Sequence, residues 1–336
     1  MRRFDNNKPA LGIDVGGTKT ELGLVDQTGE VVWRDRRPTP QLADPDPYQA
    51  FLDLLVDMVE TGVRQGGLGP RQPIGMCLPG AIDQDGRVKN SNALWMNEQP
   101  LKVDIESRLG RNAVMANDGV CFAVSEAMDG AAKEASMVFG VVLGTGVGGG
   151  LAVDGRPWHG AHGLCGEWGH NPFPVRSRAD FERLEAELGP VPTCFCGQSL
   201  CVETVLRGRA LAERYQRLTG RSVEGAQFAR LIEQKDADAQ TALHRYGLDL
   251  ARALSVVVNQ IDPDVIVLGG GVSDNDGLVS IVSEALPDYI FHAGQVDTRP
   301  QPVVRRHVWG DSSGLRGAAW MAQSLSLGSD APIAST

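Results

Sequence analysis

Three cysteines and a histidine are the residues of this sequence best suited to hold a metal ion. Cys194, Cys196 and Cys201 lie close together, and His170 ends the segment 166–170 upstream of them. Three thiolates and one imidazole can fill the tetrahedral coordination of zinc, and a closed set of four protein ligands is typical of structural rather than catalytic zinc. The spacing therefore predicts a loop fastened by zinc, placed beside a site with a different chemistry.

The sequence leaves two alternatives to this metal site open. His159 and His162 are also near enough along the chain to supply the fourth ligand. The cysteines could also be buried without a metal, since free cysteine packs as a small hydrophobic residue.

Three glycine clusters, each after an apolar strand-like run, point to phosphate binding. They are Gly16, Gly17, Thr18 and Lys19; Gly144, Thr145 and Gly146; and Gly269, Gly270 and Gly271. Without a Cβ atom the backbone can approach an anion closely and direct its N–H groups at the oxygens. One such cluster is usually a turn, but three in this setting favour phosphate. The Walker loop and the Rossmann fingerprint are absent, so we expect the phosphates to be held between hairpins.

Two aspartates lie next to predicted strand or helix ends and could serve this phosphate chemistry. Asp118 follows Asn117 directly before the helical run 120–127, so it is either a general base or the helix N-cap. Asp14 ends the first strand beside the glycine turn, where it is either an Asx-type turn residue or part of the site.

The elements that must position these residues recur in two halves of the chain. Strands are predicted at 11–15, 21–25, 31–33 and 74–78 with a helix at 48–61, and again at 137–143, 151–153 and 264–268 with helices at 203–218, 226–234, 239–260 and 314–325. Strand, glycine turn and strand occur in the same order twice. We therefore expect an internal duplication with one glycine loop from each half.

Composition narrows the class of protein. The chain has 336 residues, of which 42% are hydrophobic and 22% charged, enough for two packed domains. Its net charge of −10 argues against nucleic acid as the partner. No stretch resembles a signal peptide or a membrane span, so we expect a cytoplasmic protein without membrane contacts, whose six cysteines are ligands or buried thiols rather than disulfides.

Taken together, these segments resemble the ROK family of sugar kinases and repressors, over a stretch from about Leu11 to Trp320. The segments that carry the resemblance are 14–19, 117–118, 143–146, 166–170, 194–203 and 269–271. Four segments are most similar to bacterial fructokinases and mannokinases, namely 88–95, 123–126, 166–172 and 310–314. Leu200 departs from the pattern, because the metal loop of the family usually has glycine there.

The resemblance implies an α/β actin-like ATPase fold, related to ribonuclease H, with two domains that each contain a mixed sheet and flanking helices. The smaller domain would contain 1–117 and 310–336 with the first phosphate loop. The larger domain, 118–309, would hold the zinc loop, the second phosphate loop and the glycines of the adenosine site. A homodimer is also implied.

By the same resemblance, the site residues take specific roles. Asp118 would be the general base, and Asp14 with the three glycine clusters would bind ATP and its magnesium. His170 would be the histidine that joins the cysteines at zinc. The residues implied for the hexose are Asn92, Asn117, Asp118, Glu167, His170 and Glu203.

The resulting prediction is an ATP-dependent hexose kinase, with fructose as the first substrate and transfer to the 6-hydroxyl. Mannose, glucose or an N-acetylhexosamine are the alternative substrates. A sugar-responsive repressor is disfavoured because the first strand begins near Leu11 and leaves no room before it for a helix-turn-helix domain. A binding module without activity is disfavoured by Asp118, Lys19 and the glycine loops.

Overall fold

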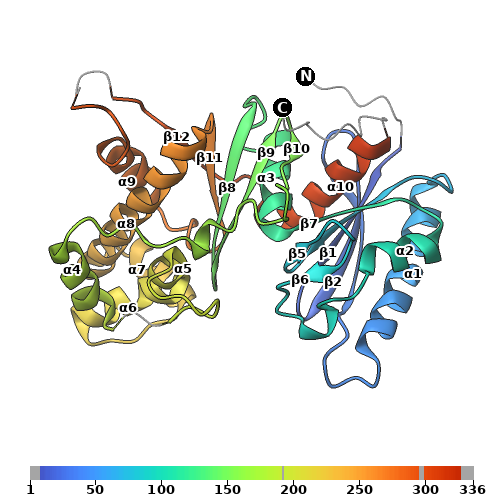
Figure 1. The fold of residues 1–336 in the computed structure, drawn as a ribbon, viewed down its shortest axis with the longest axis horizontal. Coiled ribbons are helices and arrows are strands. Elements are labelled where there is room, and N and C mark those ends of the chain that lie inside the picture. Colours follow the sequence, from blue (N-terminus) through green and yellow to red (C-terminus); the bar gives the residue numbers. More distant parts are fainter. Residues whose placement is uncertain (1–7, 191–192, 295–298, 327–336) are drawn as a thin grey trace. The chain divides into compact units, whose positions relative to one another are not determined.

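The computed structural model describes residues 8–190, 193–294 and 299–326, which pack as two units (Figure 1). Unit 1 consists of Met1–Lys133, Gly150–Cys165 and Asp311–Thr336, and unit 2 of Glu134–Gly149 and Gly166–Gly310. This grouping follows internal packing, and the domain boundaries expected from the sequence stay a prediction. No helix in the described ranges is long and apolar enough to cross a bilayer.

Unit 1 is built on a mixed five-stranded sheet in the order β3-β2-β1-β4-β7. The strands are β1 (Ala10–Val15), β2 (Lys19–Val25), β3 (Val31–Pro38), β4 (Ile74–Leu78) and β7 (Ala113–Asn117). The first three are antiparallel, whereas β4 and β7 continue from β1 in parallel. Because parallel strands end at the same edge, Asp14 of β1 and Asn117 of β7 are brought to one side of the sheet.

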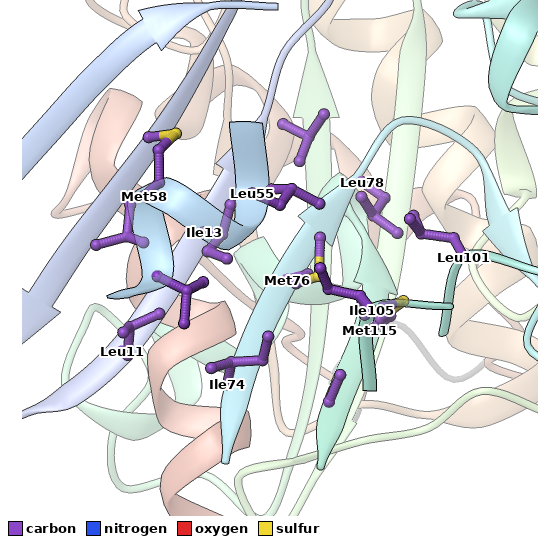
Figure 2. Packing of buried hydrophobic residues seen from close by; sticks show 14 of the residues in the cluster. Leu11, Ile13, Leu55, Met58, Ile74, Met76, Leu78, Leu101, Ile105 and Met115 are labelled. Carbon is purple, nitrogen blue, oxygen red and sulfur yellow. The ribbon is translucent and has the colours of Figure 1, made fainter. Parts of the chain in front are cut away.

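The two faces of this sheet are lined by different residue types. Leu11, Ile13, Ile74 and Met76 belong to a buried cluster with α1 (Pro47–Gly66) and α2 (Leu101–Leu109). Figure 2 shows Leu55 and Met58 of α1 in this cluster near Leu11 and Ile13. Helix α1 starts at the N-cap Asp46 and ends at Gly67 in left-handed conformation. Leu54 of the same helix is half-buried.

Glycines line the opposite face, since side chains alternate along a strand. A Cβ atom on Gly12 would lie 2.2 Å from the Leu315 carbonyl oxygen, and one on Gly75 would lie 1.7 Å from that of Ala318. Both carbonyls belong to α10 (Ser313–Ser326), which is drawn in red in Figure 1. The helix backbone therefore packs directly on β1 and β4, and a side chain at either glycine would displace it.

Helix α3 (Asp118–Met128) packs on α10 within unit 1, where a Cβ atom on Gly317 would lie 1.9 Å from the Cys121 carbonyl oxygen. Arg316 of α10 is 2% exposed and pairs with Asp129, the residue that caps the end of α3. The same guanidinium donates to the carbonyl oxygen of Gly29. The small elements of this unit are β5 (Ala81–Ile82), β6 (Val88–Lys89), η1 (Leu94–Met96) and β10 (Arg156–Pro157).

The second sheet has the order β10-β9-β8-β11-β12. Its longer strands are β8 (Met137–Leu143), β9 (Val147–Val153), β11 (Val265–Gly269) and β12 (Val303–Arg306). Strand β11 pairs in parallel with both β8 and β12. Strand β9 belongs to both units, because the grouping changes between Gly149 and Gly150.

Unit 2 is rich in helices. They are α4 (Arg178–Leu188), α5 (Val202–Leu206), α6 (Gly208–Thr219), α7 (Gly225–Glu233), α8 (Ala237–Ile261) and α9 (Leu278–Ala285), with single turns η2 (Trp168–His170), η3 (Leu286–Asp288) and η5 (Gly310–Ser312), the last of which runs into unit 1. The helix predicted at 203–218 is wrong as a single element. Arg207 has extended backbone, which separates α5 from α6.

Candidate functional site

Four potential metal ligands converge in unit 2. One ligand atom from each of His170, Cys194, Cys196 and Cys201 lies within 4.8 Å of the others. His170 is the last residue of η2, and Cys201 is the N-cap of α5. The two histidines considered as alternatives, His159 and His162, are not in this group. The spacing of the three cysteines and one histidine along the chain thus brings them together in space.

The distances within this group fit tetrahedral zinc. A Zn–S bond of about 2.3 Å places two sulfur ligands about 3.8 Å apart at the tetrahedral angle, and a sulfur and a nitrogen slightly closer. The Cys196 and Cys201 sulfurs are 3.6 Å apart, and the Cys194 sulfur is 3.5 Å from His170 Nδ1. Burial raises the pKa of the Cys201 thiol to about 12, so binding a metal here would release a proton.

The second glycine loop is held by residues that adjoin the metal ligands. Gly208 N–H donates to the Gly144 carbonyl oxygen at 2.7 Å, and Val147 N–H donates to Glu203 Oε2 at 3.2 Å. Trp168 Nε1, two residues before His170, donates to the Gly148 carbonyl oxygen at 2.9 Å. The loop between β8 and β9 is therefore fixed at both of its ends.

The third glycine cluster lies against the second within unit 2. Gly270 has a φ of 79°, and a Cβ atom on it would lie 2.4 Å from the Leu143 carbonyl oxygen. Val272 N–H donates to that same oxygen at 3.1 Å. Only glycine fits this left-handed, crowded position. These contacts bring two of the three predicted phosphate segments together, 144–146 and 269–271.

The first glycine turn lies in unit 1 between β1 and β2. Gly16 N–H donates to the Lys19 carbonyl oxygen at 2.9 Å, which closes the turn. The chain after β3 holds the turn from outside, because Thr39 Oγ1 donates to the Gly16 carbonyl oxygen and Gln41 Nε2 to that of Gly17. Gly17, Thr18 and Lys19 stay exposed.

Asp14 is placed at this turn by β1. Burial, together with the nearby charge of Asp118, raises the pKa of its carboxyl group to about 6, and a hydrogen bond from the Cys77 thiol opposes this shift. Cys77 is the register partner of Asp14 on β4. On the side of α10, a Cβ atom on Gly314 would be 2.9 Å from Asp14 Oδ2. The Asp14 carboxylate is thus enclosed and close to a second acid.

Asp118 is the first residue of α3, and the structure separates its role from that of its neighbour. Asn117 is the N-cap, because its Oδ1 accepts from Val120 N–H at 2.8 Å. Asp118 Oδ1 accepts from its neighbour Gly119 N–H at 2.8 Å. Part of the Asp118 side chain is exposed, yet the protein packed around its carboxyl group raises its pKa. The capping alternative therefore applies to Asn117, and the Asp118 carboxylate is left available for chemistry.

The residues predicted to bind a hexose fall into two sets. Asn92, Asn117 and Asp118 belong to unit 1, where Asn92 is exposed in the turn before η1. Glu167, His170 and Glu203 belong to unit 2. His170 Nε2 lies 3.8 Å from a Glu167 carboxylate oxygen, and Glu203 Oε1 lies 3.9 Å from the Cys194 sulfur. The second set therefore includes one potential metal ligand, His170, and its two carboxylates lie next to potential ligands.

A cavity of about 610 Å³ lies in unit 1, and Asn117 of the first set lines it. It is lined by β7 up to Asn117, by the β5–β6 hairpin and by the segment 159–165. His159 lines it, and burial lowers the pKa of its imidazole. Sequence reasoning did not find this cavity, because its walls come from segments far apart in the chain.

Sequence reasoning also missed Cys77, although its thiol contacts Asp14. Cys77 and Cys121 are both almost fully buried, and a hydrogen bond with Cys121 raises the pKa of the Cys77 thiol. The available signal was positional. Asp14 and Cys77 each stand near the end of an apolar strand, so pairing β1 with β4 would have placed them side by side.

Comparison with known proteins gives consistent results. A family model described as "ROK family" matches residues 10–325 of this chain. N-acetyl-D-glucosamine kinase of Salmonella typhimurium is 35% identical over 311 residues, covering 92% of this chain and 98% of that protein. Among solved structures, a ROK hexokinase from Thermus thermophilus has a TM-score of 0.76 at 27% identity, covering 95% of this chain and 99% of that one.

A second solved structure was determined with ligands. It is a ROK family glucokinase from Streptomyces griseus in complex with glucose and AMPPNP, with a TM-score of 0.71 at 24% identity. The match covers 93% of this chain and 98% of that one.

Proposed function

The chain belongs to the ROK family, and from this premise we propose that it is an ATP-dependent hexose kinase with Asp118 as its general base. Its fold is that of the actin-like ATPases, as predicted. That fold also serves proteins without kinase activity, so the proposal depends on the site. The observation that carries it lies at the start of α3, where Asn117 caps the helix and Asp118, whose Oδ1 accepts from Gly119 N–H, places its carboxylate near Asp14.

The acidic residues of unit 1 suit phosphoryl transfer to a hydroxyl group. The transition state is loose, so proton loss from the hydroxyl comes late and a carboxylate suffices to accept the proton. Asp118 takes this role in our proposal. Magnesium keeps most of its waters and takes few protein ligands, so Asp14 would orient those waters rather than coordinate the ion. The exposed Lys19 beside it would contribute positive charge to the phosphates.

Unit 2 would supply the remaining groups. The two adjoining glycine clusters, 144–146 and 269–271, would hold phosphates and the adenosine end of ATP. Zinc, when bound by His170 and the three cysteines, would have all four positions filled by protein, so its contribution is structural. It would keep the segments that carry Glu167 and Glu203 in place, and these carboxylates would accept hydrogen bonds from hexose hydroxyls.

Two hexoses are supported by separate observations. The curated relative is an N-acetyl-D-glucosamine kinase, which supports N-acetylglucosamine better than fructose, the first choice from the sequence. Fructose stays the second candidate because of segments such as 88–95 and 310–314. The candidates differ by a ring form or one substituent, and the geometry of the binding loops decides between them. In both cases we propose transfer to the 6-hydroxyl, in the cytoplasm where ATP is available.

The test is purified protein with ATP and Mg²⁺, followed by ADP release with N-acetylglucosamine, fructose, mannose, glucose and N-acetylmannosamine. We expect the highest kcat/KM with N-acetylglucosamine. A higher value with fructose would reverse the order of the two candidates and leave the kinase proposal intact. Absence of ADP release with every hexose would contradict the kinase proposal and favour a sugar-binding module.

A further inference from the structure

Glu203 lies between the potential metal ligands and the second glycine loop. We infer that Glu203 is a positioning residue that ties the metal loop, 193–201, to the phosphate loop, 144–147, and so sets the affinity for nucleotide. This inference rests on the proposed function in one respect, that loop 144–147 receives phosphates. It adds a role that differs from hexose binding and that can be measured without a hexose.

The Glu203 carboxylate contacts both loops. Its Oε2 accepts from Val147 N–H at 3.2 Å, and its Oε1 is 3.9 Å from the Cys194 sulfur. A Cβ atom on Gly146 would lie 2.7 Å from Oε2, so the loop backbone approaches the carboxylate as closely as glycine allows. One side chain therefore touches both loops.

The backbone that follows Glu203 also holds the phosphate loop. Helix α5 begins directly after the ligand Cys201, and the extended Arg207 then turns the chain so that Gly208 N–H reaches the Gly144 carbonyl oxygen at 2.7 Å. The stretch 203–208 thus holds one end of loop 144–147 through a side chain and the other through its backbone. Val205 and Leu206 within it are fully buried, and Tyr246 Oη donates to the Leu206 carbonyl oxygen.

The residues just before His170 also contact the hairpin formed by β8 and β9. Trp168 is buried and donates to the Gly148 carbonyl oxygen, and a Cβ atom on Gly169 would lie 2.1 Å from the Val147 carbonyl oxygen. Segments that flank His170 and Cys201 therefore both adjoin 144–148. Any displacement of these ligands must move groups that hold the phosphate loop.

Glu203 acts on the phosphate loop as a hydrogen-bond acceptor and not through its negative charge. A carboxylate beside a phosphate loop repels phosphate, so its negative charge cannot be what improves nucleotide binding. Its use is as an acceptor that occupies Val147 N–H and fixes the loop before the nucleotide arrives, which lowers the entropic cost of binding. A neutral acceptor of equal length should serve as well.

The experiment measures binding of ADP with Mg²⁺ by calorimetry, in zinc-loaded protein without hexose. Glu203→Ala should weaken ADP binding about 10-fold, the expected loss for one hydrogen bond to a charged group. Glu203→Gln should stay within about twofold of wild type, because its amide oxygen can accept from Val147 N–H. Glu182→Ala, on the exposed part of α4, is the matched acidic control and should leave ADP binding unchanged.

A further variant of Glu203 keeps the test informative if Glu203→Ala misfolds. Glu203→Asp keeps the charge but shortens the side chain, so it should weaken ADP binding nearly as much as alanine. Folding of each variant is checked by thermal melting. Wild-type affinity in both the Ala and Asp variants would overturn the inference, as would a Gln variant as weak as Ala, or wild-type protein that binds no ADP.

The link to the metal loop is tested by a thermodynamic cycle with Cys196→Ser. In the wild-type background this change should weaken ADP binding several-fold, and in Glu203→Ala it should add little, because the tie is already lost. Additive effects would overturn the link. Since only ADP binding is read, these outcomes are separate from the hexose panel, in which loss of all turnover would contradict the kinase proposal instead.

Discussion

At the residue scale, the pair Asn117 and Asp118 decides how the site can work. Both residue types cap helices well, and the sequence left open which of the two does so. In the structure the Asn117 side chain caps α3, so the capping hydrogen bond to Val120 N–H does not depend on Asp118. A change at Asp118 should therefore affect the reaction much more than the fold.

The first prediction concerns Asp118→Asn. Loss of the proton acceptor should lower kcat by roughly 10²–10⁴ while the melting temperature changes little. The measurement is ADP release at saturating hexose and ATP, with a thermal melt of the same sample. Near-normal turnover would remove Asp118 from the role of base.

The second prediction concerns the pH dependence set by Asp14. Its pKa of about 6 means that the carboxyl group takes up a proton as pH falls through that value and can no longer orient the waters of magnesium. We expect kcat/KM for MgATP to fall below about pH 6, and the raised pKa of Asp118 acts in the same direction.

The raised pKa of Asp14 also makes the free energy of unfolding depend on pH. The folded Asp14 binds a proton more tightly than the unfolded one, whose pKa is near 3.8, so its contribution to the free energy of unfolding decreases as pH rises from about 4 to 6. Asp14→Asn should therefore be inactive yet more stable than wild type at pH 7.5 in urea denaturation. A less stable variant would contradict this placement of Asp14.

Single residues also show what the sequence could and could not predict. Spacing predicted the cluster of three cysteines because its members lie on one short loop, but His170 depended on a resemblance until the fold brought it to the sulfurs. Cys77 could not be related to Asp14 without the pairing of β1 with β4, which joins segments separated by a helix. Contacts within a segment are readable, whereas contacts across strands require the register.

At the element scale, the stretch from Cys201 to Gly208 differs most from expectation. Its residues favour one continuous helix, which is what periodicity predicted. The structure breaks it at Arg207, so that Gly208 N–H pairs with Gly144 instead of continuing the helix. Tertiary hydrogen bonding overrides local propensity here, and the break is what places Glu203 at the phosphate loop.

The third prediction concerns Leu200 in the metal loop. Its φ of 56° is left-handed, a conformation that costs a residue with a Cβ atom about 1–2 kcal/mol, so the departure from glycine noted in the sequence carries strain. Leu200→Gly should raise the free energy of unfolding by about 0.5–1 kcal/mol, since glycine also gains freedom when unfolded. Chemical denaturation of zinc-loaded protein is the measurement. A destabilised variant would show that packing of the half-buried Leu200 side chain outweighs the strain.

The fourth prediction concerns the junction of α10 with α3. Arg316→Ala leaves the Asp129 carboxyl group, whose pKa burial already raises to about 6, without its partner. Breaking such a pair should cost about 3–5 kcal/mol in the free energy of unfolding. Arg178→Ala, where the arginine is 91% exposed, is the matched control and should change it by less than about 0.5 kcal/mol. Equal effects of the two variants would exclude a buried ion pair at this junction.

At the scale of the whole molecule, the resemblance implied two mixed sheets with flanking helices, and the structure has two five-stranded mixed sheets. Strands β7 and β12 were missed, because short runs such as 113–117 carry little periodicity. The hexose could not be read from sequence at all. The candidate hexoses differ by a ring form or one substituent, and the geometry of binding loops discriminates between such ligands.

The fifth prediction concerns zinc. Zinc would bind the folded ligand set more tightly than the unfolded chain, so removing it should lower the melting temperature by at least about 5 °C, as expected for the loss of a few kcal/mol of linked binding. The measurement compares protein treated with a chelator and then dialysed with the same sample after zinc is restored. An unchanged melting temperature in a sample verified as free of metal would contradict a structural zinc site.

The packing of α10 on β1 and β4 has a consequence for synthesis of the protein. The glycine-lined face of the first sheet is made early, but the helix that covers it, α10, is made only after all of unit 2. At about 5–20 residues per second, this face waits on the order of 10–60 s for its cover. During that interval the growing chain exposes an unfinished sheet, and we expect it to depend on chaperones that bind nascent chains.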